Sequence, residues 1–349
     1  MTTVDPGVRD RARPVPKPPV LEATHVTKHF RVRDGAGRSS TVQAVEDVSL
    51  SLQPGRIVAL VGESGSGKTT LARLLARFYS VTSGSIRLRG LSVKGRPDKE
   101  YFRSVQLIFQ DPFGSLHPGH KISYNLERPL RIHRHAKNRA DARRQAAELL
   151  ERVGLTPAED FLDKLPYELS GGQRQRVVIA RALAVQPAVL LGDEPISMLD
   201  VSIRLDMLNL LARLRDEEGL ALLYITHDIA SARYLCDDVA VMYAGQMIES
   251  GPKDAVIQQP MHPYTKLLVD ASPDPGRERD DFTGDLDDAD GPDEPPSLVD
   301  PPAGCRFHPR CPFAMDECRR DLPERTDLGN GHWVRCWLHQ KGRAEELAG

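Results

Sequence analysis

The sequence predicts an α/β protein in which helices cover a mainly parallel β-sheet, followed by a small cysteine-rich tail. Strand-like apolar runs alternate with helical segments such as residues 71–75 and 201–218, and this alternation is typical of parallel sheets. The 349 residues, of which 40% are hydrophobic, suffice for one large domain and a smaller appendage. Strands are expected at residues 21–26, 42–52, 57–61, 105–109, 189–191, 220–226 and 239–243.

The overall charge gives no reason to expect a nucleic-acid partner. Lys and Arg number 47 and Asp and Glu number 49, so the formal net charge is -2 and any basic surface must be local. The first nineteen residues lack the apolar segment of a signal peptide. No apolar stretch approaches the ~18 residues needed to cross a bilayer. We therefore expect the chain to meet a membrane only through partners.

Changes in composition and in the spacing of apolar residues divide the chain into segments. Between residues 111 and 170 apolar residues repeat at helical spacing without a convincing strand, which indicates an inserted helical subdomain. Residues 131–144 are rich in Arg and His, which suits a solvated helix face or an anionic partner, and no site is assigned there. Residues 278–300 hold ten acidic residues and one basic residue, a composition typical of a linker. The expected parts are a flexible arm at 1–19, a main domain at 20–258, an extension at 259–273, an acidic linker at 274–300 and a cysteine-rich tail at 301–349.

A glycine-rich motif follows the predicted strand at 57–61. Residues 62–69 read GESGSGKT and fit the pattern G-x-x-x-x-G-K-[ST], in which backbone N–H groups surround phosphate oxygens. Lys68 supplies a full positive charge, and the Thr69 hydroxyl is suited to ligate Mg²⁺. The predicted phosphate-binding residues are Gly62, Glu63, Ser64, Gly65, Ser66, Gly67, Lys68, Thr69 and Thr70.

Further motifs follow in a specific order and give a resemblance to a family. Leu169 is followed by the sequence SGGQ, the strand at 189–191 ends in Asp193 and Glu194, and His227 follows the strand at 220–226. Over about residues 21–251 this order resembles the ATP-binding cassette (ABC) family. The resemblance implies a P-loop ATPase that binds ATP and Mg²⁺, with an antiparallel β edge and an inserted helical subdomain.

The resemblance also implies roles for individual residues. Glu194 would polarise the attacking water, and His227 would contact the γ-phosphate. Thr69, Gln110 and Asp193 would hold Mg²⁺, and Phe30 would stack on adenine, although one aromatic near a strand is also suited to the core. Five more residues are expected to complete the nucleotide site: Ser170, Gly171, Gly172, Gln173 and Asp200. The first four would come from the second subunit of a dimer.

The C-terminal part is similar to one branch of this family. Residues 262–265 read HPYT, and residues 301–305 and 310–312 read PPAGC and RCP, as in subunits that drive oligopeptide, dipeptide or nickel uptake. This resemblance implies peptide import from the cytoplasmic face of the membrane, with nickel import and a non-transport soluble ABC protein as alternatives. The implied partners are two membrane-spanning permeases, a second ATPase that is either a paralogue or another copy, and an external substrate-binding protein, with no nucleic acid.

Four of the five cysteines lie close together in the tail. Four thiolates suit an iron-sulfur cluster of the [4Fe-4S] type or Zn²⁺, and a short module with little core would gain stability from a metal. Unligated thiols remain the plain alternative. We also expect the acidic linker to separate this tail from the cassette. The candidate ligands are Cys305, Cys311, Cys318 and Cys336.

Overall fold

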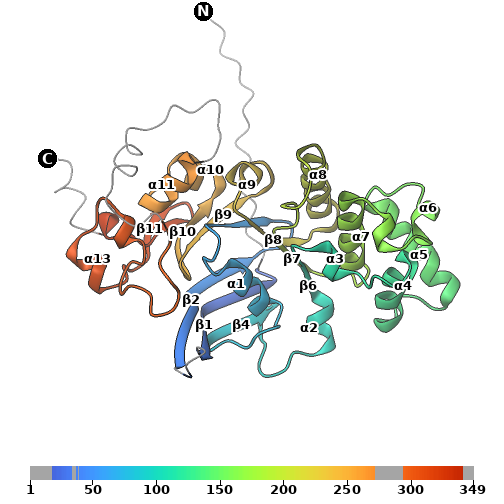
Figure 1. Cartoon of the computed structure of the whole chain (residues 1–349), viewed down its shortest axis with the longest axis horizontal. Coiled ribbons are helices and arrows are strands. Elements are labelled where there is room, and N and C mark those ends of the chain that lie inside the picture. The colour runs from blue at the N-terminus through green and yellow to red at the C-terminus, as the bar shows by residue number, and fades with distance from the viewer. Residues whose placement is uncertain (1–17, 34–36, 38, 272–293, 341–349) are drawn as a thin grey trace, which may run out of the picture.

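The computed structural model describes residues 18–33, 37, 39–271 and 294–340 (Figure 1). Most of the predicted arm and most of the predicted acidic linker lie outside these described residues. Figure 1 shows an elongated molecule with helices α4, α5 and α6 at one end and α13 with β11 at the other. The sheet and helix α1 occupy the centre, between these two ends.

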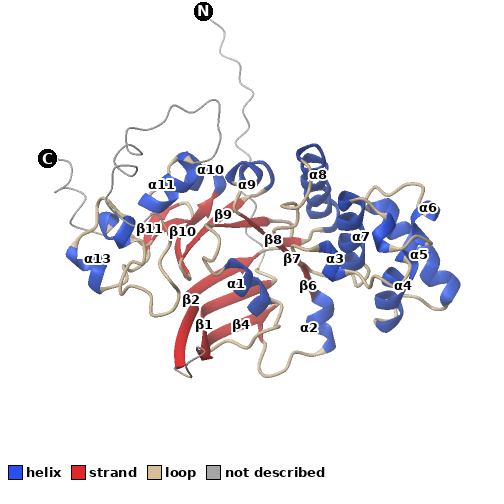
Figure 2. Cartoon of the chain, in the orientation of Figure 1, coloured by secondary structure: helices blue, strands red, loops and turns tan. Residues whose placement is uncertain are grey.

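One mixed sheet runs through the described residues, in the order β5-β4-β1-β2-β10-β9-β3-β8-β7-β6 (Figure 2). Strands β9, β3, β8, β7 and β6 pair in parallel with one another, as predicted, whereas β10 runs antiparallel to β9, and β1, β2, β4 and β5 form an antiparallel part. The strands are β1 (Leu21–Arg33), β2 (Ser39–Leu52), β3 (Ile57–Val61), β4 (Ser83–Leu88), β5 (Leu91–Ser92), β6 (Val105–Ile108), β7 (Val189–Asp193), β8 (Ala221–Thr226), β9 (Asp238–Tyr243), β10 (Gln246–Pro252), β11 (Thr326–Gly329) and β12 (His332–Val334).

Helices cover the sheet, and a group of them forms the region predicted to be helical between residues 111 and 170. That region contains α3 to α6, and no strand interrupts it. The helices are α1 (Lys68–Leu75), α2 (Lys99–Ser104), α3 (Pro112–Ser115), α4 (Ile122–Ile132), α5 (Arg139–Arg152), α6 (Glu159–Leu162), α7 (Gly171–Leu183), α8 (Val201–Glu218), α9 (Ile229–Leu235), α10 (Lys253–Gln258), α11 (Pro263–Asp270) and α13 (Asp316–Arg320), with 3-10 turns at Pro166–Glu168, His308–Arg310 and Trp337–His339.

Strand β3 is fully enclosed, as are β7 and β8. All five of its residues are buried, because β8 and β9 flank it and both of its faces are covered. Ile57, Ala59 and Val61 pack into one core cluster, and Val58 and Leu60 pack into the other. The phosphate-loop motif leaves this strand at its carboxyl end, where parallel sheets place their ligand sites.

The C-terminal tail joins the sheet, so the expectation that a linker keeps it apart from the cassette is wrong. Glu249 and Ser250 of β10 pair with Val334 and Trp333 of β12. Strand β10 is free to do so because its pairing with β2 is limited to Gln246, which leaves the rest of that edge open to another strand. The tail and the cassette therefore share one hydrogen-bonded sheet.

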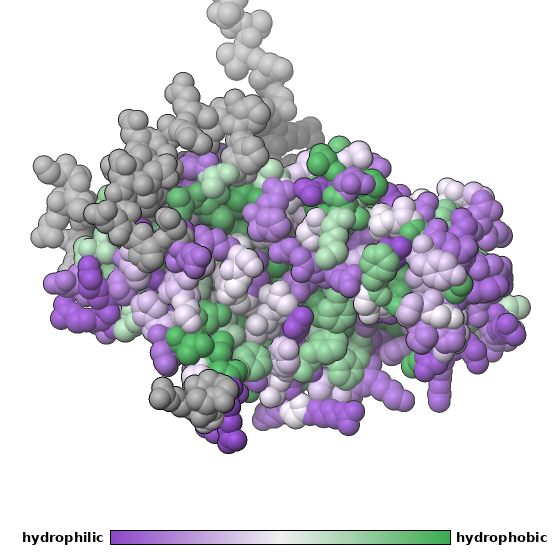
Figure 3. Space-filling view, in the orientation of Figure 1, coloured by the Kyte–Doolittle hydropathy of each residue, from purple (hydrophilic) through white to green (hydrophobic). Residues whose placement is uncertain are grey.

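Among the described residues, no helix combines the length and the apolar character that a membrane span requires. On the face shown in Figure 3, hydrophobic residues form separate patches, and the region of the helical subdomain is mostly hydrophilic.

Candidate nucleotide-binding site

A cleft of about 860 Å³ opens over the carboxyl end of β3. It is lined by the whole glycine-rich loop and by Phe30, Gln110, Glu194 and His227, which come from four other parts of the chain. The structure thus brings together most of the residues predicted to form a nucleotide site. The remaining lining residues are Val42, Ala44, Leu268 and Leu298.

Two glycines of the loop have no room for a side chain. Gly62 has φ 152°, and a Cβ there would lie 2.1 Å from the Met242 carbonyl oxygen. Gly67 has φ 100°, and its Cβ would lie 2.3 Å from the Ala44 carbonyl oxygen. Both contacts are far below van der Waals distance, so the loop follows this path only with glycine at both positions.

Lys68 lies at the start of α1 and is buried in the loop. Its Nζ donates hydrogen bonds to the carbonyl oxygens of Gly62 and Glu63, both at 2.7 Å, and to Ser66 Oγ at 3.2 Å. Burial lowers the pKa of Lys68 to about 8, although the nearby carboxylates of Glu194, Asp193 and Glu63 oppose this shift. The ammonium group is therefore held next to the helix N-terminus, where an anion would gain most from it.

Two adjacent carboxylates at the end of β7 contact the loop and the cleft. Asp193 accepts a hydrogen bond from Thr69 Oγ1 at 3.0 Å, and burial raises the pKa of Asp193. Glu194 turns out of the strand with φ 47°, a left-handed conformation that is uncommon for this residue type. Its carboxylate accepts a hydrogen bond from Gln110 Nε2 at 3.0 Å and lies 3.4 Å from His227 Nδ1.

Phe30 forms part of the opposite wall. The ring is half-buried, makes an edge contact with Tyr79 at 5.2 Å between centroids, and has Lys28 Nζ 4.8 Å from its centroid. Because it lines the cleft and is not enclosed in the core, the ring retains a surface on which a planar ligand could stack.

The serine-glycine motif lies outside the residues that line this cleft. Ser170 caps α7: its Oγ accepts from Gln173 N–H at 3.2 Å, and Gln173 Oε1 accepts from Ser170 N–H at 3.0 Å. Gly171 and Gly172 form the first turn of the same helix, and Asp200 is exposed at the start of α8. The residues of this motif and Asp200 therefore do not line the cleft of their own chain.

Sequence analysis did not identify the residues that hold Glu63 from the C-terminal side. The hydroxyl of Tyr264 accepts a hydrogen bond from Glu63 N–H at 2.8 Å, and Arg310 Nη1 lies 3.0 and 3.1 Å from the two Glu63 carboxylate oxygens. Tyr264 and Arg310 belong to the motifs HPYT and RCP, which pointed to a branch of the family but not to the phosphate loop.

The four tail cysteines line one small cavity together with His262 and His308. Cys305, Cys318 and Cys336 are buried, and Cys311 is half-buried. Burial raises the pKa of Cys305 to about 11 and that of Cys311 to about 12. Within the described residues, no three His, Cys, Asp or Glu side chains form a group suited to hold a metal ion.

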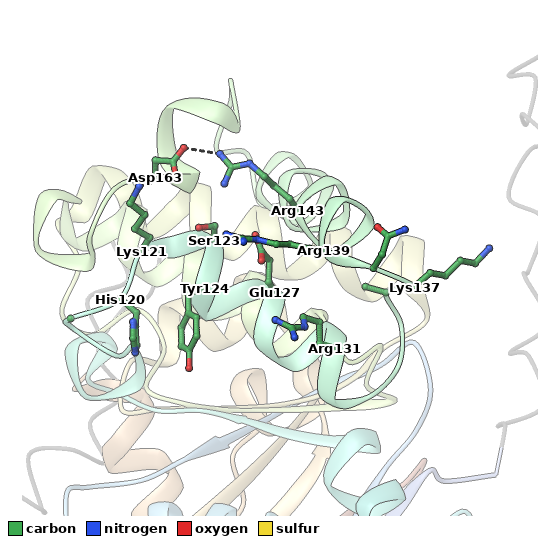
Figure 4. Close-up of a pocket in the computed structure, with 13 residues that line it drawn as sticks. His120, Lys121, Ser123, Tyr124, Glu127, Arg131, Lys137, Arg139, Arg143 and Asp163 are labelled. Atoms are coloured by element: carbon green, nitrogen blue, oxygen red, sulfur yellow. Dashed lines mark hydrogen bonds and ion pairs between the residues drawn. The ribbon is translucent and has the colours of Figure 1, made fainter.

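A second hollow, of about 830 Å³, lies on the helical subdomain (Figure 4). Figure 4 shows Arg143 of α5 reaching Asp163, at 2.7 Å, and Lys121 also pairs with Asp163, at 3.1 Å. Arg144 pairs with Asp141 at 2.6 Å. Acidic neighbours thus offset part of the charge of the basic stretch at 131–144, as on a solvated helix face.

Comparison with known proteins places these features in a family. Residues 45–197 match the ABC transporter family, and residues 248–318 match the family described as oligopeptide/dipeptide transporter, C-terminal region.

Two relatives and one solved structure illustrate the similarity. The di/tripeptide transport ATP-binding protein DppF of Pseudomonas aeruginosa is 41% identical over 87% of this chain and 93% of its own. The oligopeptide transport ATP-binding protein AppF of Bacillus subtilis is 38% identical over 92% of this chain and 97% of its own. The dimeric, post-hydrolysis structure of the ATP-binding cassette MJ0796 bound to ADP and Pi superimposes with a TM-score of 0.60 at 29% identity, over 67% of this chain and 98% of its own. The chain therefore belongs to the ATP-binding proteins of the ABC transporter family, in the branch with the oligopeptide/dipeptide transporter C-terminal region.

Proposed function

We propose that this ABC ATPase energises the import of oligopeptides or dipeptides through a membrane transporter. The main support for this proposal is that one chain contains both an ABC cassette and an oligopeptide/dipeptide transporter C-terminal region. Relatives that match over most of their length are named for the transport of di-, tri- or oligopeptides, which supports the same substrate class.

In this proposal the phosphates of ATP lie against the glycine-rich loop. Backbone N–H groups at the start of α1 and the ammonium of Lys68 offset their charge. Glu194 orients and polarises the attacking water, and His227, beside it, contacts the γ-phosphate. The adenine ring stacks on Phe30.

Oxygen atoms near the loop fit Mg²⁺, which prefers hard oxygen ligands. The hydroxyl of Thr69 and the carboxylate of Asp193 already contact each other, and the amide of Gln110 lies at the same cleft. When bound, Mg²⁺ supplies positive charge that offsets charge on the phosphate oxygens. These three side chains would hold it.

The serine-glycine motif is proposed to act on the nucleotide of a second ATPase subunit. Two observations support this: Ser170 and its neighbours do not line the cleft of their own chain, and the similar MJ0796 cassette is dimeric with ADP and Pi bound. Ser170 and Gly172 lie at the N-terminus of α7, where N–H groups favour an anion. Asp200, at the start of α8, is also proposed to complete the nucleotide site. The second subunit is a paralogue or another copy of this chain.

The tail cysteines are proposed to hold an iron-sulfur cluster, with Zn²⁺ as the competing metal. Four thiols around one cavity provide the donor set of a [4Fe-4S] cluster. The cysteines are spaced more widely along the sequence than the C-x₂₋₄-C pairs typical of Zn²⁺ sites, which favours a cluster over Zn²⁺. Since burial raises the pKa of the Cys305 and Cys311 thiols, a metal would have to displace their protons on binding.

The proposed assembly contains two membrane-spanning permeases and an external substrate-binding protein, with the ATPases at the cytoplasmic face of the membrane. Affinity purification of the tagged full-length chain from native membranes tests this. Recovery of the permeases is expected, whereas recovery of ribosomes or DNA in their place would overturn the transporter assignment.

The substrate is tested by uptake into cells that carry either the wild-type chain or Glu194→Gln. We expect uptake of a radiolabelled di- or oligopeptide to require the wild-type chain. Nickel uptake that depends on the chain, without peptide uptake, would refute the proposed substrate class.

A further inference from the structure

We propose that Arg310 and Tyr264, which lie outside the cassette, are positioning residues for ATP because they hold Glu63 of the phosphate loop. Glu63 is held at three points. Its N–H donates to the Tyr264 hydroxyl at 2.8 Å, its carbonyl oxygen accepts from Lys68 Nζ at 2.7 Å, and its carboxylate lies 3.0 and 3.1 Å from Arg310 Nη1. Two of the three partners thus belong to the C-terminal region.

Both partners are themselves held firmly. Tyr264 is fully buried, and its ring packs against Tyr243 at 4.5 Å and Phe307 at 5.5 Å between centroids. The Arg310 side chain is only 14% exposed, lies over the rings of Tyr243 and Phe307, and is 3.3 Å from the Tyr243 hydroxyl. Since neither side chain has room to move away, both hold Glu63 in a fixed position.

Charge explains why Glu63 needs Arg310. Glu63 lines the cleft, so its carboxylate lies on the wall of a site that receives phosphate oxygens. An unpaired carboxylate there would repel the nucleotide, and the partly buried position leaves the repulsion only partly screened. The Arg310 guanidinium neutralises this charge from behind the loop, while the Tyr264 hydroxyl accepts a backbone N–H that would otherwise lack its partner.

The test is steady-state ATPase activity of the full-length chain in the assembled transporter, as a function of ATP concentration. We expect Arg310→Gln to raise the KM for ATP about tenfold with kcat within about twofold, because the lost contact affects binding more than the chemical step. The double variant Arg310→Gln/Glu63→Gln should recover most of the lost affinity, because the repelling charge is gone. The control Arg319→Gln alters an exposed arginine of the same tail and should match the wild type.

Tyr264→Phe keeps the buried ring and removes only the hydroxyl, so it tests the backbone contact separately. A KM increase of about threefold to tenfold is expected, with the tail still folded by tryptophan fluorescence. The proposal is overturned if Arg310→Gln has the same KM as Arg319→Gln, or if the double variant binds ATP no better than Arg310→Gln. An unchanged KM in Tyr264→Phe would remove that residue from the proposal.

Discussion

Glu249 gives a sharp prediction, because its carboxylate is completely buried at the junction between the cassette and the tail. Its Oε1 lies 2.9 Å from Met261 N and 2.8 Å from His332 Nε2, and its Oε2 accepts from His262 N at 2.8 Å. The contacts come from the segment before α11 and from β12. One side chain therefore joins three parts of the chain, and we expect Glu249→Gln to loosen the tail.

The size of the effect follows from the geometry. In whichever orientation a glutamine side chain sits, its NH₂ group replaces one carboxylate oxygen and faces the N–H of either Met261 or His262. A buried donor left without an acceptor costs about 1–3 kcal/mol, and the other contacts lose the strengthening that the negative charge provides. We therefore expect Glu249→Gln to lower the free energy of unfolding of the tail by about 2–4 kcal/mol.

The chain offers a specific assay for this prediction. Its two tryptophans, Trp333 and Trp337, both lie in the tail, so urea unfolding followed by tryptophan fluorescence reports on that region. Glu217→Gln, at an exposed position of α8, is the matched control and should stay within about 0.5 kcal/mol of the wild type. Equal unfolding midpoints for the two variants would refute the reasoning.

Three further predictions concern the nucleotide site and the cysteines. Glu194→Gln should still bind ATP but release phosphate about 10² to 10⁴ times more slowly, the usual scale for a lost general base, and undiminished phosphate release would exclude that role. The pKa of Lys68 is about 8 in the free protein, and bound phosphate favours its charged form. ATP affinity should therefore fall as pH rises through about 8. Calorimetric titration that shows constant affinity from pH 7.5 to 9.5 would contradict this. After anaerobic purification, iron and acid-labile sulfide should be present in the wild type and should decrease in Cys305→Ser. Colourless protein with stoichiometric zinc would reject the cluster. Protein without any metal would reject both the cluster and the zinc site.

Much of the cleft was predictable because its signals are local. The glycine motif follows one apolar strand, and the two carboxylates end another. Gln110 and His227 follow two further strands. All of these residues lie at the carboxyl ends of parallel strands, which meet at one edge of a sheet. The predicted strands are all present, but β4, β5, β10, β11 and β12 were not predicted. Strand β1 continues to Arg33, beyond the predicted end at residue 26, because it pairs with β2 over this length.

The separation of the tail was predicted wrongly for an equally physical reason. The acidic, proline-rich composition before residue 301 predicts a segment with little capacity to fold alone, most of which lies outside the described residues, and composition carries no information on where the next segment docks. Docking depended on the open edge of β10 and on the buried pair of Glu249 and His332, which lie 2.8 Å apart.

The sequence by itself determined the family and the ATP chemistry and predicted the residues that would supply it, because these depend on residue types at short, fixed spacings. Only the tertiary structure decided that Arg310 pairs with Glu63, far earlier in the chain. Neither charge pattern nor spacing identifies such a pair. Its partners meet because β12 pairs with β10 and Phe307 packs against Tyr243 and Tyr264, and this long-range packing places the arginine beside Glu63 of the phosphate loop.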